Sequence, residues 1–265
     1  MSDKRGNFEA PAHPRRAPDL ACVLQSVGTM NHVASRTMRQ VAFVCLTCLP
    51  LAVLAQQPYP VPRELPPAAT TQLAKSLAGS KAHATHVWRD TRALNDDNTV
   101  NAYVEISRGD RRKWEFAMDA NARAIDRIMP EHIGGYPVNY GFVPQTISYD
   151  GDPFDALVLG PPIPGGRVVR GVIVGLMLME DEKGWDAKVV LSVPGPGTAP
   201  RHQLTDRDRE DIASYFRRYK EHEPGKFSKV PGWGSIADGM GHVRTTHAFF
   251  RECRESGGAP CRLPG

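Results

Sequence analysis

Residues 150–159 read DGDPFDALVL, so three carboxylates within six residues lead directly into an apolar run. The run at 156–159 has the composition of a buried strand. If the chain is already extended before this run, Asp150 and Asp152 share one face, because residues two apart in a strand point the same way. Two bare carboxylates on one face repel each other, whereas a hard divalent cation binds both through oxygen. The stretch therefore predicts a metal-binding segment at the start of a strand.

The hexamer at 150–155 has two alternative interpretations. Taken alone, Asp-Gly is also typical of a solvated turn. An EF-hand loop is excluded, because a loop beginning at Asp150 has no glycine at its sixth position and has Pro161 rather than glutamate at its twelfth. The remaining metal ligands must come from other parts of the chain.

A second acidic cluster, MEDEKGWDAK at 179–188, lies between two apolar runs and is typical of a hairpin tip. With residues 183–184 as the turn, Asp181 faces Asp186 directly across the two strands. Opposed like charges destabilise a sheet unless a positive group lies between them. Lys188 projects on the same face as Asp186 and can either neutralise it or reach an anionic ligand. We interpret the two clusters as bridged by metal.

The segments around these clusters predict a mainly β domain. Runs with period-2 alternation at 103–106 and 113–116 flank a turn at 108–110, and we interpret them as paired strands. Further apolar runs at 168–178 and 187–193 alternate with turns rich in proline and glycine. Most of this sheet is expected to be antiparallel and to close into a small barrel.

Two helices are expected after the strands. Thr205 and Asp208 form a capping box, and apolar residues then recur at i, i+3, i+4 and i+7 from Ile212. The Pro-Gly pair at 224–225 ends this helix. A second helix at 235–253 is less strongly indicated, because each of its two internal glycines costs about 1 kcal/mol relative to alanine.

Cations and hydroxyl donors accompany the acids. Carboxylates bind hard metals, metals bind phosphate oxygens, and Lys or Arg neutralise the remaining phosphate charge, as phosphoryl-transfer sites require. The candidate anion-binding residues are Lys113, Arg127, Tyr140, Lys188, Tyr219 and Lys220. Tyr219 also completes the apolar stripe of its helix, so a structural role stays open for it. No Walker loop, GxGxxG fingerprint or HExxH motif occurs. His83 and His86 have no further ligands nearby, so we expect them to be solvated.

The hexamer at 150–155 closely resembles the signature D-x-D-P-x-D of the family I soluble inorganic pyrophosphatases. Further motifs of that family match in the same order, namely Glu105, Lys113-Trp114-Glu115, Asp126-Arg127, YPVNYG at 136–141, Asp181, Asp186-Ala187-Lys188 and Tyr219-Lys220. The resemblance covers roughly residues 101–250. It implies a mainly β (α+β) fold with an OB-like five-stranded closed β-barrel flanked by two helices. It also implies Mg²⁺-dependent hydrolysis of pyrophosphate to two phosphates by a metal-activated water.

The resemblance also implies a role for each matching position. Asp152 is implied as the proton acceptor, and Glu105 as a partner that supports the ligands. Several Mg²⁺ ions per site are implied, with the ligands Asp150, Asp155, Asp181, Asp186 and Glu115. The implied substrate-phosphate ligands are Lys113, Arg127, Tyr140, Lys188, Tyr219 and Lys220.

The N-terminal residues 1–55 are predicted to be an extension that ends in a signal peptide. The apolar stretch at 41–55 follows Arg36 and Arg39 and ends in a small residue, as signal peptidase requires. It is too short for a transmembrane helix, which needs about 20 apolar residues, and Pro50 interrupts it. We therefore expect a periplasmic or secreted protein without a stable membrane anchor. A cytoplasmic protein is the alternative if the stretch is not a signal.

The rest of the chain is predicted to divide into a Pro-rich, poorly ordered linker at 56–97, a catalytic domain at 98–253 and a tail at 254–265. Removal of the signal peptide would leave two cysteines, Cys253 and Cys261. In an oxidising compartment we expect one disulfide between them, with two free thiols as the alternative.

The formal net charge of +4 and the absence of a dense Lys/Arg run interleaved with aromatics do not point to nucleic acid as a partner. Pyrophosphate is the expected partner, and a homo-oligomer is left open. Two alternatives remain, namely an OB-like module that binds an oligonucleotide, and a hydrolase for another phosphoanhydride.

Overall fold

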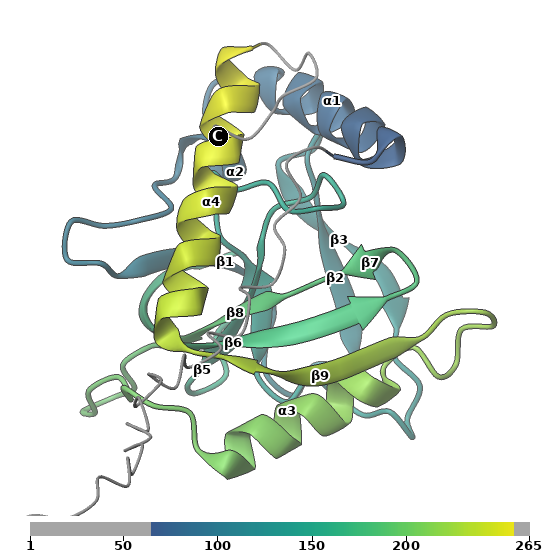
Figure 1. Cartoon of the computed structure of the whole chain (residues 1–265), viewed down its shortest axis with the longest axis vertical. Coiled ribbons are helices and arrows are strands. Elements are labelled where there is room, and N and C mark those ends of the chain that lie inside the picture. Colours follow the sequence, from purple (N-terminus) through teal and green to yellow (C-terminus); the bar gives the residue numbers. More distant parts are fainter. Residues whose placement is uncertain (1–64, 257–265) are drawn as a thin grey trace, which may run out of the picture. The chain divides into compact units, whose positions relative to one another are not determined.

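Five strands form a closed ring in the computed structural model, which describes residues 65–256 (Figure 1). In ring order they are β1 (Val100–Ile106), β4 (Asn139–Phe142), β5 (Asp155–Leu159), β8 (Lys188–Ser192) and β6 (Val168–Asp181), and β6 pairs again with β1. All pairs are antiparallel except β5–β8, which is parallel. The expected closed five-stranded, OB-like arrangement is confirmed.

Strand β5 is apolar on both faces because side chains from a different core cluster pack against each face. Alternate residues of β5 enter different clusters: Leu157 packs with Phe216 of helix α3 (Asp206–Arg218), whereas Val158 packs in the cluster that contains Val243 of helix α4 (Ile236–Glu255). A strand that is buried on both faces gives a continuous apolar run rather than alternation. This explains the uninterrupted ALVL of the sequence.

Helices α3 and α4 begin where the sequence predicts them, each with a capping box. Helix α3 ends at Arg218, before the Pro-Gly pair at 224–225 that was predicted to end it. Gly239, which weakened the prediction of α4, has a packing role. A Cβ at Gly239 would lie 2.9 Å from Ile173 and 3.0 Å from the carbonyl oxygen of Gly175. The missing side chain therefore lets α4 approach β6 closely.

The predicted pairing of 103–106 with 113–116 is wrong. Strand β2 (Arg112–Ala117) pairs with β3 (Ala122–Ile128) in a separate two-stranded sheet. The reason is that β4 and β6 already occupy the two edges of β1. Two further strands, β7 (Gly184–Trp185) and β9 (Ser228–Gly234), pair with β6.

The turn of the hairpin at 179–188 lies one residue earlier than predicted. Asp181 pairs with Gly184, so residues 182–183 form the turn, and Asp181 does not face Asp186 across the strands. Gly184 has φ +117°, a conformation that glycine adopts without strain.

Helices α1 (Pro67–Lys81) and α2 (Val87–Asp90) lie in the segment predicted to be a poorly ordered linker. Proline is common at the first position of a helix, so the proline run ends where α1 begins. Leu73 and Leu77 of α1 are buried in one cluster with Trp88 and Phe250. Residues 67–90 are therefore packed against the strands and α4 rather than extended.

His86 is buried rather than solvated, with 1% exposure. Its Nε2 lies 2.9 Å from the carbonyl oxygen of Met118, and its ring also caps α2 by accepting a hydrogen bond from the Arg89 amide. Burial lowers the pKa of His86 below its ordinary value. Its role is structural.

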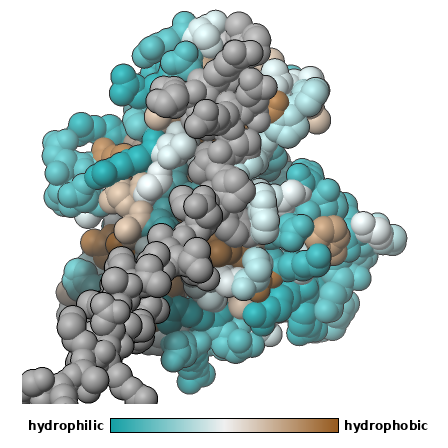
Figure 2. All heavy atoms as spheres, in the orientation of Figure 1, coloured by the Kyte–Doolittle hydropathy of each residue, from teal (hydrophilic) through white to brown (hydrophobic). Residues whose placement is uncertain are grey.

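Cys253, near the end of α4, is fully buried and disulfide-bonded. The predicted partner Cys261 and the predicted signal segment at 1–55 lie outside the described residues. Among residues 65–256, no helix has the length and hydropathy needed to cross a bilayer. The coloured surface in Figure 2 is largely hydrophilic.

Candidate active site

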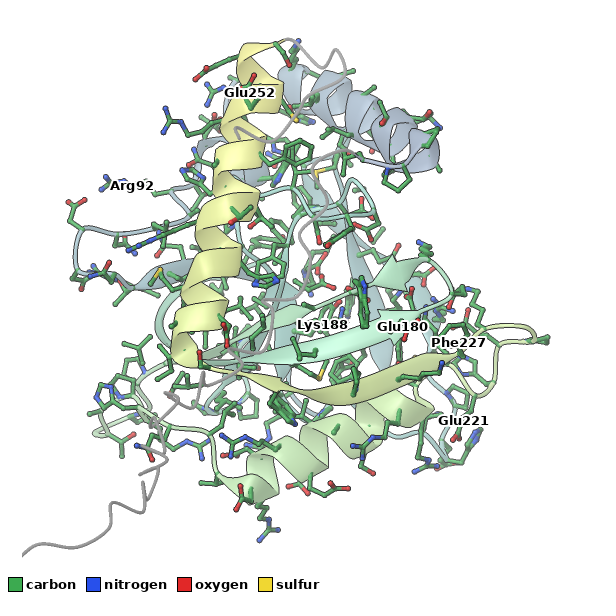
Figure 3. All side chains as sticks on the ribbon, in the orientation of Figure 1. Arg92, Glu180, Lys188, Glu221, Phe227 and Glu252 are labelled. Carbon is green, nitrogen blue, oxygen red and sulfur yellow. The ribbon has the colours of Figure 1, made fainter. Side chains whose placement is uncertain are left out.

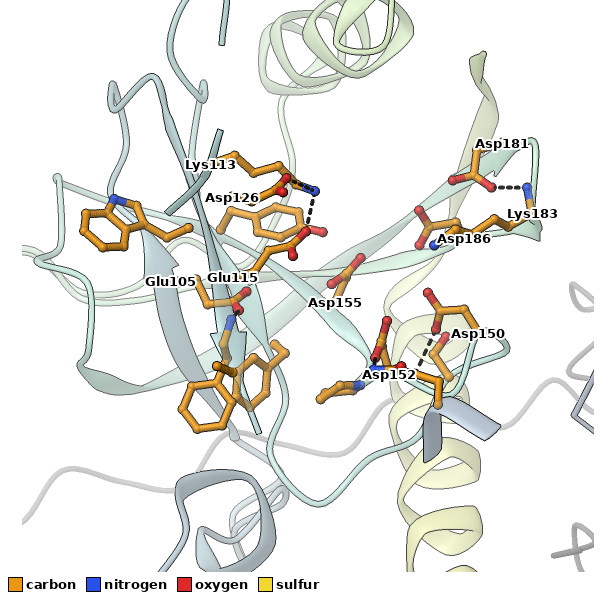
Figure 4. Close-up of a pocket in the computed structure, with 18 of the residues that line it drawn as sticks. Glu105, Lys113, Glu115, Asp126, Asp150, Asp152, Asp155, Asp181, Lys183 and Asp186 are labelled. Atoms are coloured by element: carbon orange, nitrogen blue, oxygen red, sulfur yellow. Dashed lines mark hydrogen bonds and ion pairs between the residues drawn. The ribbon is translucent and has the colours of Figure 1, made fainter. Parts of the chain in front are cut away.

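A cavity of about 740 Å³ collects the predicted site residues (Figure 4). Its lining includes Glu105, Lys113, Glu115, Arg127, Tyr140, Asp150, Asp152, Asp155, Asp181, Asp186, Tyr219 and Lys220. These residues come from β1, β2, β3, β4, β5 and β6 and from the loops and helix end beside them. Lys188 lies beneath the lining, 1% exposed, and contacts two of the lining aspartates. The structure thus brings all the predicted site residues together.

Asp150 and Asp152 lie in a turn before β5 rather than in an extended strand. The Asp152 amide donates to Asp150 Oδ1 at 3.1 Å, and the Ser148 amide donates to the Asp152 carbonyl at 2.7 Å. Gly151 has φ +85°, which favours glycine at this position. The turn, and not the two-residue spacing of a strand, holds the two carboxylates side by side.

The aspartates of the cavity are unfavourable as bare charges. Burial, with the neighbouring Asp152 and Asp186, raises the pKa of Asp150 to about 7. Burial also raises the pKa of Asp152 and of Asp186, with Asp155 adding to both shifts. Each shift means that the environment disfavours the ionised form until a positive charge arrives.

Lys188 supplies part of that positive charge. Its Nζ lies 2.5 Å from Asp155 Oδ2 and 2.8 Å from Asp186 Oδ1. Burial alone would lower the pKa of Lys188, but the two carboxylates more than offset this and raise the pKa above its ordinary value. Figure 3 shows Lys188 among the strands, whereas Arg92 and Glu252 project outward.

Lys220 has a similar place at the other acidic segment. Its Nζ lies 2.7 Å from Asp181 Oδ2 and 2.9 Å from Glu182 Oε2. Asp181 is further held by the Lys183 amide, which donates to Oδ1 at 2.8 Å. Figure 4 shows Asp181, Lys183 and Asp186 opposite Lys113 across the cavity.

The two-stranded sheet carries the opposite wall. Lys113 Nζ lies 2.6 Å from Glu115 Oε1 and 3.3 Å from Asp126 Oδ2. Behind them, Glu105 accepts a hydrogen bond from the Phe116 amide at 2.7 Å and so links β1 to β2. Burial, aided by Asp155, raises the pKa of Glu105 well above its ordinary value.

Tyr140 and Tyr219 offer hydroxyl groups to the cavity. Burial and the nearby aspartates raise the pKa of both phenols well above the ordinary value. Both therefore stay protonated at neutral pH and can donate to an anion. Tyr219 also packs against the core cluster, so it has the structural role that the sequence left open.

Divalent cations suit this donor set, because carboxylate oxygens are the ligands that Mg²⁺ prefers and burial disfavours the ionised forms of Asp150, Asp152 and Asp186. Among the described residues, no group of three acidic, His or Cys side chains is close enough to form a ready-made metal site. Lys188 and Lys220 pair with three of the predicted ligands. Metal binding therefore requires some of these ion pairs to rearrange.

Several cavity residues had no distinguishing signal in the sequence. Gln72, Lys75 and Ser76 belong to the segment predicted as linker, and Lys226 follows a Pro-Gly turn. Glu223 was likewise not predicted, although its Oε2 lies 2.6 Å from Nη1 of Arg127, which lines the cavity. The contact depends on the fold, because Glu223 follows α3 and Arg127 belongs to β3, which are far apart in the sequence.

Glu223→Gln should flatten the acid dependence of stability. Burial alone raises the pKa of Glu223, but Lys226 and Arg127 lower it to about 2 overall. A carboxyl whose folded pKa is depressed stabilises the fold above its unfolded pKa, and this contribution is lost as pH falls toward the folded pKa. We expect the variant to be less stable at pH 7 by about 1–2 kcal/mol, because solvent screens part of the pairing.

Urea unfolding between pH 7 and pH 2.5 measures this difference. The difference in unfolding free energy between wild type and Glu223→Gln should narrow below about pH 4.5, near the ordinary pKa of glutamate. Glu221→Gln is the matched control, since Glu221 is half exposed and pairs only loosely with Arg218 at 3.5 Å. A stability difference that stays constant with pH would contradict the depressed pKa of Glu223.

The family model described as "Inorganic pyrophosphatase" matches residues 102–251. A protein named "Inorganic pyrophosphatase" from Ralstonia nicotianae is 41% identical over 150 residues, which cover 53% of this chain and 85% of that protein. One of the same name from Saccharolobus solfataricus is 37% identical over 153 residues, covering 55% and 88%.

Solved structures agree with these relatives. The crystal structure of inorganic pyrophosphatase from Thermus thermophilus is similar with a TM-score of 0.55 and 33% identity, covering 63% of this chain and 99% of that one. The inorganic pyrophosphatase of Coxiella burnetii gives a TM-score of 0.54 and 32% identity, covering 60% and 99%. Since the profile spans more than half of the chain and the relatives align over most of their length, this protein belongs to the family of soluble inorganic pyrophosphatases, family I.

Proposed function

We propose that this chain hydrolyses inorganic pyrophosphate to two phosphates in a Mg²⁺-dependent reaction. The observation that carries the proposal is the cavity itself, in which buried aspartates with raised pKa values lie beside Lys and Arg side chains. Such a site needs divalent cations for its acids and an anion for its bases, and a complex of Mg²⁺ with a small diphosphate provides both.

The metal ligands in this proposal are Asp150, Asp155, Asp181, Asp186 and Glu115. Mg²⁺ bound at these acids would supply water activation and neutralisation of phosphate charge. Asp155 and Asp186 are close enough together to share one ammonium group, that of Lys188, so the same two carboxylates can share a cation. The Lys, Arg and Tyr residues of the site are proposed to bind and orient the substrate.

The chemistry assigned to the chain is positioning and proton transfer. Water attacks one phosphorus, the bridging P–O bond breaks, and Asp152 accepts the proton that the attacking water loses. Phosphate charge is met by the cations Lys113, Arg127, Lys188 and Lys220 and by the protonated phenols of Tyr140 and Tyr219. Glu105 holds β2, which carries Lys113, through the Phe116 amide.

Phosphate release from pyrophosphate tests the function directly. With Mg²⁺ the full chain should release two phosphates per pyrophosphate, and a chelator should lower the rate by about 100-fold or more. Excess Mg²⁺ added afterwards should restore activity, which separates metal loss from unfolding. Inactivity with every divalent cation tried would overturn the proposal.

A substrate panel separates the alternatives. Faster release from a nucleoside triphosphate or a short polyphosphate than from pyrophosphate would indicate a different phosphoanhydride hydrolase. Salt-sensitive binding of single-stranded DNA without Mg²⁺, and no hydrolysis, would indicate an OB-like binding module.

We further propose that the protein acts after export, with residues 98–253 as its catalytic domain and Cys253 bridged to Cys261. The apolar segment at 41–55 after two arginines supports export. The disulfide at Cys253 supports an oxidising compartment. Mass spectrometry of the secreted, unreduced protein tests both points, through the N-terminal residue and the Cys253 linkage.

A further inference from the structure

Helix α1 lies outside residues 102–251, the part of the chain that the family model matches, yet it lines the cavity. We propose that α1 forms an additional wall of the active site, in which Gln72 holds the Asp152 carboxylate and Lys75 with Ser76 binds a phosphate oxygen of the substrate. This inference rests on the proposed hydrolysis of pyrophosphate.

The three residues lie on one face of α1. Lys75 and Ser76 follow Gln72 at i+3 and i+4, so each of them neighbours Gln72 on the helix surface. All three line the cavity. The apolar stripe of the same helix, Leu73 and Leu77, is buried against Trp88, Phe250 and their neighbours.

Helix α1 packs against the turn that carries Asp150 and Asp152. A Cβ at Gly151 would lie 2.3 Å from the carbonyl oxygen of Ala69, so the glycine between Asp150 and Asp152 allows the first turn of α1 to contact the backbone of the acidic hexamer. Ala69 is itself buried. The helix therefore has a defined position relative to the two aspartates, close to the upper end of α4 in Figure 1.

Gln72 acts on Asp152 as a positioning residue. Its Nε2 donates to Asp152 Oδ1 at 3.4 Å. A long hydrogen bond of this kind is common in a ligand-free site and shortens in the substrate complex. With Oδ1 engaged by the amide, Oδ2 is the oxygen left to accept a proton. An amide is suited to this task because it donates without adding charge.

Ser76 and Lys75 point to an anion. Ser76 is 2% exposed, and its Oγ has no hydrogen-bond partner among the described residues. A buried hydroxyl without a partner costs about 1–3 kcal/mol, which a phosphate oxygen in the cavity would relieve. Lys75, one residue earlier and also in the cavity lining, carries the charge that such an oxygen needs. The other candidate phosphate ligands come from β2, β3, β4, β8 and the end of α3, so α1 adds a cation from a separate side.

Steady-state kinetics of the full chain at saturating Mg²⁺ test the proposed role of α1. Gln72→Ala should lower kcat about 10-fold and change KM less than about 2-fold, because it disturbs the proton acceptor and not the substrate. Lys75→Ala should raise KM about 5- to 10-fold with kcat retained, and Lys75→Arg should restore most of the loss. Alanine suits exposed helix positions, so these variants should fold.

Two controls come from the same helix. Thr71→Ala and Lys81→Ala remove a hydroxyl and a lysine that do not line the cavity, and they should match the wild type. Calorimetric binding of inorganic phosphate gives a readout apart from turnover, and Lys75→Ala and Ser76→Ala should each weaken it at least about 3-fold. Equal kinetics and phosphate affinity for the test and control variants, in an active wild type, would overturn the inference. An inactive wild type would instead overturn the proposed function.

Discussion

Asp152→Asn is expected to fold normally and to lose about 10²–10⁴-fold in pyrophosphate turnover. This is the range that a positioned general base contributes. The amide keeps the shape of the side chain and the hydrogen bond from the Asp152 main chain to Asp150. It removes the group that accepts the proton from the attacking water.

The substitution has a second consequence at Asp150. The charge of Asp152 is one cause of the raised pKa of Asp150, after burial. In the variant that pKa should fall, so the metal-free site should still take up Mg²⁺ at neutral pH. Retained Mg²⁺ binding by calorimetry, together with lost phosphate release, separates a role in proton transfer from a role in metal binding.

Asp211→Asn is the matched control, since Asp211 lies on the exposed face of α3 away from the cavity. It should keep wild-type turnover. Near-normal hydrolysis by Asp152→Asn would refute the assignment of Asp152 as proton acceptor. A loss of both hydrolysis and Mg²⁺ binding would reassign Asp152 to the metal ligands.

The second large effect is expected for Lys188→Met. Methionine keeps the length and packing of the side chain but leaves Asp155 and Asp186 without their shared ammonium group. Removing one partner of a buried ion pair typically costs about 3–5 kcal/mol. We expect this loss in the metal-free protein, measured by urea unfolding with a chelator present.

Mg²⁺ should recover part of that stability in Lys188→Met, because a cation can neutralise the two orphaned carboxylates. Turnover should stay low, since the variant lacks a cation for the substrate phosphate. Lys229→Met, at an exposed position of β9, is the control and should change neither quantity. Equal stability of Lys188→Met and wild type without metal would contradict the buried pairing.

The sequence predicted the chemistry of the site more fully than its geometry. The acidic hexamer and the Lys and Tyr residues in family order identified residues that all meet at one cavity. Their local conformations were less predictable. Asp150 and Asp152 lie in a turn rather than in a strand. Asp181 pairs with Gly184 in the β6–β7 hairpin and does not face Asp186. Side-chain type is local information, whereas strand register depends on partners far away in the chain.

Helix α1 is the clearest case in which sequence patterns did not predict the structure. The prolines before Pro67 are typical of a linker, and Gln72, Lys75 and Ser76 have no motif. What makes α1 part of the folded unit is the burial of Leu73 and Leu77 beside Phe250, which is about 175 residues later in the chain. Helix propensity is a weak signal, and a tertiary contact of this kind overrides it.

Residue identity and spacing within short segments were enough to predict the donor set and, through the resemblance that they carry, the family and the closed ring of strands. The folded arrangement was needed to show which lysine neutralises which carboxylate, how the two-stranded sheet is paired, and that a helix before residues 102–251 lines the cavity. The physical reason is that these features depend on burial and on charges brought together across the chain. Neither can be read from neighbouring residues.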